Sequence, residues 1–250
     1  MSRPPSRSRP NVSLARALSK LGTASRAQAR ELILAGRVTV NGRTLMNPEV
    51  RVHPEGEAIA VDGEVVTRGR RVYLMMNKPD GAVTTRSDER GRRTVYDLLK
   101  DQDRRLFPVG RLDQRSQGLL LFTNDAQWAN ALMDPESKIP KVYEVRLDRE
   151  MKDQDIERFR SGLILDDGYQ SRPAKIKRLP RADGPWVEVA ITEGKNRQVR
   201  RMMKALGYDV QVLIRTRIGP VALADLREGT VRILTPDEIR VLKVKTATRP

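Results

Sequence analysis

The sequence predicts an α+β protein with two domains, a small N-terminal domain over residues 12–66 and a larger domain over residues 72–243. The chain has 250 residues, 38% of them hydrophobic, which suits a small domain followed by a larger one. Helical and strand patterns occur in both segments. In the larger segment the helical patterns are too few and too uneven for a doubly wound fold. We therefore expect a mixed, mostly antiparallel sheet flanked by helices there.

The small domain is expected to begin with two short helices. Apolar residues recur at helical spacing at four positions, Leu14, Ala17, Leu18 and Leu21. Gly22 follows them and is placed to end this helix. Ser25 can then cap a second helix, in which the apolar residues are Ala29, Leu32 and Ile33.

A hairpin follows the two helices. Residues 37–43 are typical of a strand that enters a two-residue turn at Asn41-Gly42, because Asn-Gly accepts the positive backbone angles of such a turn. Short strands around residues 59–61 and at Val65 are expected to complete the domain.

The larger domain opens on an almost wholly apolar run, residues 72–76, which is typical of a strand buried on both faces. Residues 77–81 are expected to end this strand, since they include Pro79 and Gly81. Further strands are predicted at residues 118–123, 142–147, 186–191 and 210–214. Helices are predicted near residues 126–133, 152–161 and 198–206.

The remaining segments are expected to lie outside the two domains. Residues 1–11 are rich in Ser, Arg and Pro and lack the apolar centre of a secretory signal, so we interpret them as a disordered basic arm. Residues 67–71 are a plausible linker, and residues 244–250 form a tail.

The charge of the chain indicates a polyanionic partner. Lys and Arg number 48 against 32 Asp and Glu, which gives a net charge of +16 and a pI near 10.6. Nucleic acid is the leading partner, since the sequence has no run of about 18 apolar residues and no basic amphipathic helix that would favour a membrane. We expect a cytoplasmic protein, mainly because of the inferred RNA partner. The absence of cysteine fits a reducing compartment.

Basic residues gather on or beside the two predicted helices of the small domain. They are Arg16, Lys20, Arg26, Arg30 and Arg37. They can form a surface that faces RNA phosphates, or simply a solvated helix face. The order of two helices and a hairpin, ending in Gly36 to Gly42, resembles the αL RNA-binding domain named after a small-subunit ribosomal protein. This resemblance favours RNA binding.

Composition also limits the chemistry. The chain has no cysteine and one histidine, His53, so neither a zinc site with nitrogen and sulfur ligands nor a Cys/His nucleophile can be assembled. No Gly-rich phosphate loop of the nucleotide-binding type is present. Carboxylate chemistry supported by arginine remains possible, as does binding without chemistry.

Three segments of the larger domain suit a site that modifies a nucleotide. In the first, Asp113 lies between arginines where a turn meets an apolar strand. In the second, Tyr143 can stack on a base. In the third, residues 193–203, a turn leads into a helix crowded with arginines. Each segment has a simpler explanation: the aspartate forms a turn, the tyrosine fills the sheet, and the arginines are solvated. Cations at a helix start oppose the helix dipole, which favours an anionic partner there.

Together these segments resemble the RsuA/RluB/RluE/RluF family of ribosomal RNA pseudouridine synthases over nearly the whole chain, from Val12 to about Leu242. The motifs that carry the resemblance are Gly110-Arg111-Leu112-Asp113 with Gly118-Leu119-Leu120-Leu121, Lys141-Val142-Tyr143, and Gly194-Lys195-Asn196-Arg197-Gln198-Val199-Arg200-Arg201-Met202. Asn77-Lys78-Pro79-Asp80-Gly81 and Ile218-Gly219-Pro220 match other family signatures. The resemblance implies the pseudouridine synthase fold and the conversion of uridine to pseudouridine in ribosomal RNA.

The resemblance also implies roles for individual residues. Asp113 would be the catalytic nucleophile or base, Tyr143 the ring that stacks on the uracil, and Arg200 the cation that pairs with Asp113. Leu213 would supply an apolar wall, and two further arginines, Arg111 and Arg197, would contact the substrate backbone. The isomerisation needs no cofactor and no metal, and we expect a monomer that acts on ribosomal RNA or a pre-ribosomal particle.

Two alternatives stay open at this point. The form of the segment from Gly194 to Met202 looks closer to the enzymes that act on large-subunit RNA, but small-subunit RNA is the alternative target. A ribosome-assembly protein that binds RNA without turnover is the alternative function. The presence of Asp113, Tyr143 and Arg200 together argues against it, because a binding protein has no need of that set.

Overall fold

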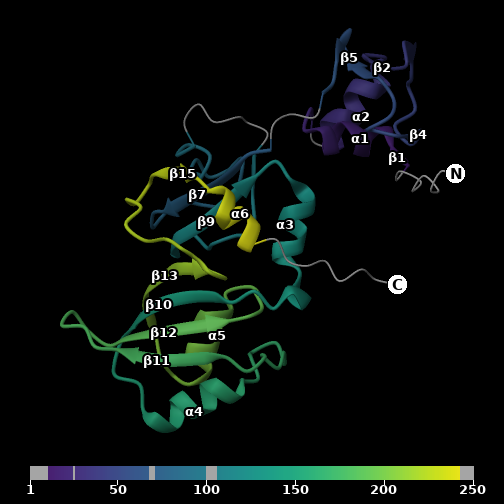
Figure 1. Cartoon of the computed structure of the whole chain (residues 1–250). Coiled ribbons are helices and arrows are strands. Elements are labelled where there is room, and N and C mark those ends of the chain that lie inside the picture. Colours follow the sequence, from purple (N-terminus) through teal and green to yellow (C-terminus); the bar gives the residue numbers. More distant parts are fainter. Residues whose placement is uncertain (1–10, 25, 68–70, 100–105, 243–250) are drawn as a thin grey trace, which may run out of the picture. The chain divides into compact units, whose positions relative to one another are not determined.

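The computed structural model describes residues 11–24, 26–67, 71–99 and 106–242. Ser25, most of the expected linker, the tail from residue 244 and the basic arm up to residue 10 lie outside these ranges. The chain divides into two compact units, residues 1–71 and 72–250 (Figure 1).

The described residues of the first unit form two helices and two small sheets. The helices are α1 (Leu14–Leu21) and α2 (Arg26–Leu34). An antiparallel sheet has the order β3 (Arg43–Thr44), β2 (Val38–Val40), β5 (Ile59–Val61) and β6 (Glu64–Val65), and β1 (Val12–Ser13) pairs with β4 (Arg51–Val52).

The first helix, the hairpin turn and the two last strands of this unit form as predicted. The four apolar residues of α1 are buried, and Gly22 ends the helix in the left-handed conformation, with φ 82°. At the hairpin, Asn41 and Gly42 have φ values of 51° and 79°, the positive angles that a two-residue turn between β2 and β3 requires. Strands β5 and β6 also lie where they were expected.

The second unit is built on one mixed sheet, which has nine strands among the described residues. The order along the sheet is β11 (Lys175–Leu179), β12 (Trp186–Ile191), β10 (Lys141–Leu147), β13 (Val210–Ile218), β9 (Gln117–Thr123), β7 (Tyr73–Lys78) and β15 (Val231–Ile233). Short strands β8 (Phe107–Pro108) and β14 (Val221–Ala222) pair with β9 and β13. The predicted mixed, mostly antiparallel sheet is thus confirmed: β13 and β9 run parallel, and the other strand pairs described are antiparallel.

Both faces of this sheet are covered at β7 and β9. Along β7 and β9, alternate side chains enter two different cores, as strand geometry requires. Leu74, Met76, Leu120 and Phe122 belong to the core that also contains residues of α4 (Asp153–Ser161) and α5 (Gln198–Ala205). Tyr73, Met75, Leu119 and Leu121 belong to the core that contains residues of α3 (Ala126–Met133). A 3-10 turn, η1 (Pro135–Ser137), and α6 (Pro236–Val241) complete the unit.

Two strand predictions need correction. Strand β7 continues to Lys78, two residues beyond the apolar run, because Lys78 still pairs with Gly118 of β9. Strand β13 extends to Ile218, four residues beyond the predicted end, since Arg217 and Ile218 pair with both β10 and β14. The short strands β1, β4, β8, β14 and β15, the longer strand β11, η1 and helix α6 were not predicted.

The parallel contact between β13 and β9 lies at the centre of the sheet, where Gly118 pairs with Arg215. Gly118 has φ +96°, and a Cβ atom there would lie 2.3 Å from the carbonyl oxygen of Arg215. A side chain at position 118 would therefore separate the two strands. Because the loop that carries Asp113 leads directly into β9, this close approach also sets the position of the loop.

Candidate active site

Asp113 is held by the backbone on either side of it. The preceding residue, Leu112, is buried, and both of its peptide groups bond to Thr84: the hydroxyl donates to the Leu112 carbonyl at 2.7 Å and accepts from the Leu112 amide at 3.3 Å. After it, the amide of Ser116 donates to the carbonyl oxygen of Asp113 at 3.0 Å. The carboxylate of Asp113 is partly exposed and makes no hydrogen bond or ion pair within the described residues. It is therefore available to a ligand.

A buried lysine fixes the loop that follows Asp113. Lys78, at the end of β7, is fully buried, and its ammonium donates to the carbonyl oxygens of Pro79 at 3.0 Å, Gln114 at 3.3 Å and Ser116 at 2.7 Å. Sequence reasoning did not assign this role, although a lysine at the end of a buried strand is itself an unusual signal. The ammonium also places a positive charge near Asp113.

Burial lowers the pKa of Lys78 from 10.5 to about 8, and the charges of Asp80 and Asp113 oppose this shift. Between these two values the unfolded chain binds more protons than the folded one, so this group makes the protein more stable as the pH rises from 8 to 10.5. We expect a change from pH 7.5 to 9.5 to stabilise the wild-type chain relative to Lys78→Met by about 2 kcal/mol.

Urea unfolding followed by tryptophan fluorescence measures this difference, because both tryptophans, Trp128 and Trp186, lie in the second unit. The other titrating groups are common to the two chains and cancel in the comparison. An identical pH dependence in wild type and variant would contradict the assigned cost of burying the ammonium.

Arg200, on α5, also supports this loop. Its guanidinium donates to the carbonyl oxygens of Val210 at 2.9 Å and Arg115 at 2.6 Å. Burial, followed by the charge of Arg197, lowers the pKa of Arg200, and the charge of Asp113 opposes the shift. No ion pair within 4.0 Å joins Arg200 and Asp113 among the described residues, so their direct pairing stays a prediction. The guanidinium instead orients the loop through its backbone.

A cavity of about 650 Å³ opens beside Asp113. Five of the six predicted site residues line it: Arg111, Asp113, Tyr143, Arg197 and Leu213. Arg200 is not part of the lining. Tyr143 on β10 and Leu213 on β13 come from adjacent strands and are both buried, so they supply an aromatic and an apolar wall. Arg111 and Arg197 are exposed, and Arg197 occupies the N-cap of α5 in the left-handed conformation.

Four further cations line this cavity, Lys141, Arg172, Lys195 and Arg215, and sequence reasoning did not assign them a role. Arg215 is 6% exposed; its Nε donates to the carbonyl oxygen of Leu119 at 2.8 Å, and one terminal nitrogen is buried without a hydrogen-bond partner in the described structure. Burial, and then the charge of Arg215, lowers the pKa of Lys141. The cavity therefore combines an apolar wall with Lys and Arg side chains that can donate hydrogen bonds to oxygen atoms of a ligand.

The comparisons with known proteins agree with this architecture. Residues 72–205 match the family described as RNA pseudouridylate synthase, and residues 12–59 match the S4 domain. A protein of Aquifex aeolicus described as an uncharacterized RNA pseudouridine synthase is 39% identical over 229 residues, which cover 90% of this chain and 91% of the relative. The ribosomal large subunit pseudouridine synthase B of Bacillus subtilis is 36% identical over 233 residues, which cover 92% of this chain and 95% of the relative.

A solved structure is also similar. A crystal structure of a pseudouridylate synthase superimposes with a TM-score of 0.67 at 31% sequence identity and covers 92% of this chain and 99% of its own. The chain belongs to the RNA pseudouridine synthase family. It is thus an isomerase with an S4 domain at its N-terminus, as the sequence motifs predicted.

In this synthase the buried carboxylate of Glu193 connects several residues that line the cavity. Glu193 accepts hydrogen bonds from the Tyr169 hydroxyl at 2.7 Å, from the Arg172 amide at 3.0 Å and from the side-chain amide of Gln198. The first of these bonds raises the pKa of Tyr169. Lys195 lies 4.5 Å above the Tyr169 ring. This network connects the start of α5 to the loop before β11. It therefore holds these two parts of the cavity wall together.

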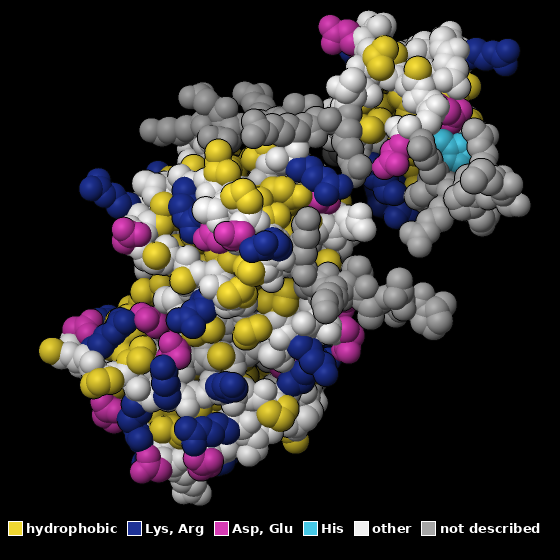
Figure 2. Space-filling view, in the orientation of Figure 1, with side chains coloured by type: hydrophobic (Ala, Val, Ile, Leu, Met, Phe, Trp, Pro, Cys, Tyr) yellow, Lys and Arg dark blue, Asp and Glu magenta, His cyan; other side chains and the backbone are white. Residues whose placement is uncertain are grey.

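The five predicted RNA-binding residues of the S4 domain differ in their partners. Arg30 pairs with Glu49 at 2.7 Å, and Arg37 makes two bonds with Asp62, at 2.8 and 2.6 Å. The other three side chains, Arg16, Lys20 and Arg26, are exposed and make no hydrogen bond or ion pair with the described part of the chain. Over the face shown in Figure 2, Lys and Arg side chains are spread out with Asp and Glu side chains between them.

Among the described residues, no group of three or more His, Cys, Asp or Glu side chains is placed to hold a metal ion. None of the described helices is long and apolar enough to span a membrane.

Proposed function

We propose that this synthase converts a uridine of ribosomal RNA to pseudouridine and that Asp113 is its catalytic carboxylate. The observation that carries the proposal is the setting of Asp113: its carboxylate has no partner among the described residues and borders a cavity with one aromatic and one apolar wall. Lys78 and Arg200 hold the adjoining backbone by its carbonyl groups. A group held in this way reaches its substrate without further ordering, which favours catalysis.

The cavity walls suit a flipped uracil. The ring of Tyr143 stacks on the base, and Leu213 closes the apolar side. The exposed guanidinium groups of Arg111 and Arg197 contact the RNA backbone near the mouth. A target base must first leave its stack, since no side chain can reach it there. Stacking on an aromatic ring contributes about 1–3 kcal/mol, which offsets much of the cost of unstacking a loop nucleotide.

The reaction rearranges one bond and needs no net oxidation or hydrolysis. The bond from C1′ to N1 breaks, the uracil turns, a bond from C1′ to C5 forms, and the proton lost from C5 is balanced by one gained at N1. Asp113 can serve in two ways: as a nucleophile that traps C1′, or as a base that removes a ribose proton and gives a glycal intermediate. Both routes need an ionised carboxylate.

Three features support ribosomal RNA as the substrate, with large-subunit RNA as the preferred target. The Bacillus subtilis relative is described as a large-subunit synthase, and its likeness extends over nearly the whole of both chains. The segment from Gly194 to Met202 has the form expected of such enzymes. The exposed side chains of Arg16, Lys20 and Arg26 in the S4 domain can contact phosphates of a folded RNA. This substrate implies a cytoplasmic enzyme.

Pseudouridine mapping of ribosomal RNA from cells with and without the gene tests the proposal. We expect one pseudouridine to disappear from large-subunit RNA and to return when the wild-type gene is restored. A chain with Asp113→Asn, expressed at the same level, should not restore it. Loss of a site in small-subunit RNA would correct the target, and an unchanged map would instead support an RNA-binding assembly protein.

A further inference from the structure

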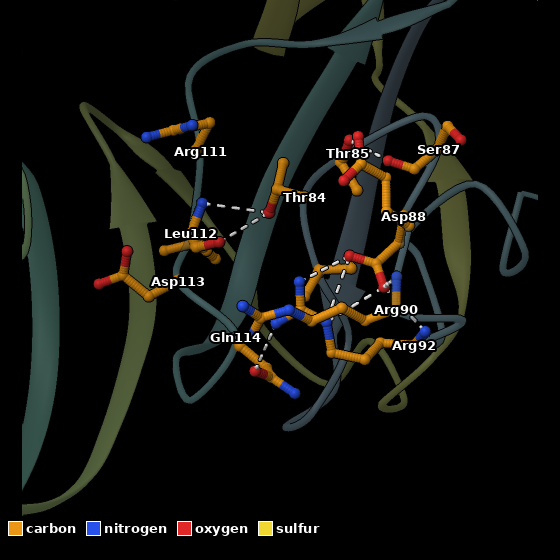
Figure 3. Close-up of a pocket in the computed structure, with 12 residues that line it drawn as sticks. Thr84, Thr85, Ser87, Asp88, Arg90, Arg92, Arg111, Leu112, Asp113 and Gln114 are labelled. Carbon is orange, nitrogen blue, oxygen red and sulfur yellow. Dashed lines mark hydrogen bonds and ion pairs between the residues drawn. The ribbon is translucent and has the colours of Figure 1, made fainter.

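A second cavity, of about 420 Å³, lies against the same loop as Asp113 (Figure 3). It shares three lining residues with the first cavity, Arg111, Leu112 and Asp113. The rest of its wall comes mainly from the segment after β7, with the side chains of Thr84, Thr85, Ser87, Asp88, Glu89 and Arg90. Figure 3 shows the Asp113 carboxylate pointing away from Asp88 and Arg92. The loop over residues 111–113 therefore borders both cavities.

The wall of this second cavity is held in place by its own hydrogen bonds. Asp88, whose side chain is 6% exposed, accepts bonds from the amides of Arg90 and Arg92 and from the Arg92 guanidinium. These bonds from Arg92 lower the pKa of Asp88 to about 2. Arg92 also donates to the side chain of Gln114 at 3.3 Å, and Val83 bridges to Thr94. The cavity is therefore formed before any ligand arrives.

Other polar groups in the wall have no partner in the part of the chain that the structure describes. The side chains of Glu89, Arg90 and Arg111 are exposed and make no hydrogen bond or ion pair within the described residues. The guanidinium of Arg90 and the carboxylate of Glu89 suit a nucleotide, since arginine binds phosphate and a carboxylate accepts from the amino groups of bases. Figure 3 shows the Arg111 guanidinium pointing to the side of Asp113 instead. Uracil has no exocyclic amino group. The second cavity therefore suits a different base from the one proposed for the first cavity.

The shared wall relates the two cavities to one strand of RNA. When the target uracil fills the first cavity, its ribose lies at Asp113, and the RNA backbone must leave past Arg111 and Leu112. We propose that the second cavity binds the nucleotide next to the target uridine and that Glu89 selects a base with an exocyclic amino group there. This inference rests on the proposed function, because it takes the first cavity as the uridine site.

Selection from an RNA hairpin pool with a randomised loop tests this inference without turnover. The full chain with Asp113→Asn serves as the parent, and bound RNAs are sequenced. We expect enrichment of a uridine together with a preference of roughly fivefold or more for adenine, cytosine or guanine over uracil at one adjacent position. Adding Glu89→Ala should remove the neighbour preference and keep the uridine enrichment. Adding Arg90→Ala should weaken binding of all selected RNAs alike.

Two substitutions provide matched controls. Arg93 is exposed and lies in the same segment but outside the cavity lining, and Glu150 is an exposed glutamate remote from it in sequence. Arg93→Ala and Glu150→Ala should retain both preferences. A parent without a neighbour preference, or a preference that survives Glu89→Ala, would overturn the inference while the rRNA map still supports the proposed function. A parent that enriches no uridine would overturn both the uridine site and its neighbour.

Discussion

Replacing Asp113 with Asn should lower pseudouridine formation by roughly 10⁴-fold or more, the scale seen when the key catalytic group of an enzyme is removed. Asn has the same shape, but it can neither attack C1′ nor accept a proton. The backbone contacts of Lys78, Thr84 and Arg200 do not involve the carboxylate, so the loop should keep its conformation. Pseudouridine formation is measured on ribosomal RNA from cells lacking the gene, and affinity for the same RNA by filter binding.

Asp80→Asn is the matched control for this variant. Asp80 is an exposed neighbour that pairs with Arg115 at 3.4 Å and does not line the first cavity. Removing its charge should change the rate by less than about fivefold, since exposed ion pairs contribute little. RNA affinity should stay within about threefold of wild type in both variants, which corresponds to less than about 1 kcal/mol. Substantial turnover by the Asp113→Asn chain would exclude Asp113 as the catalytic group.

Replacing Gly118 with Ala should destabilise the second unit by about 3 kcal/mol or more, because the new Cβ would meet the backbone of Arg215 at 2.3 Å and the residue has φ +96°. The neighbouring atoms are the carbonyl oxygen, carbon and amide nitrogen of Arg215 in β13, so no side-chain movement can relieve the contact. The two strands would have to separate at their parallel pairing, which also displaces the Arg215 side chain in the cavity wall. Urea unfolding followed by tryptophan fluorescence measures the loss.

Gly168→Ala separates the steric contact from the backbone strain. Gly168 also has a positive φ, +77°, but a Cβ atom there would have no neighbour within 4 Å. This variant should lose only about 1 kcal/mol, the typical cost of an unfavourable backbone angle. An equal loss of unfolding free energy in the two variants would show that the steric contact between β9 and β13 does not contribute to the destabilisation.

Much of the fold could be predicted from periodicity. Helix α1, the hairpin at Asn41-Gly42 and strands β9, β10 and β12 follow from spacing and turn chemistry, which depend on neighbouring residues in the chain. Strands β14 and β15 have only two and three residues, which is too short for a periodic pattern. They are defined by their pairing with β13 and β7. The ends of β7 and β13 were missed for the same reason.

The site divides in the same way. By its residue types and motifs, the sequence alone determined the family, the order of the domains and the candidate set around Asp113, because these are properties of side chains in chain order. Only the tertiary structure decided how the set is supported. In the folded chain, Lys78 and Arg200 donate to backbone carbonyl groups, and Arg215 lies in the cavity wall. A second cavity also lies against the loop that carries Asp113. Backbone carbonyl groups are identical at every position, so a sequence cannot indicate which of them a buried cation will bind.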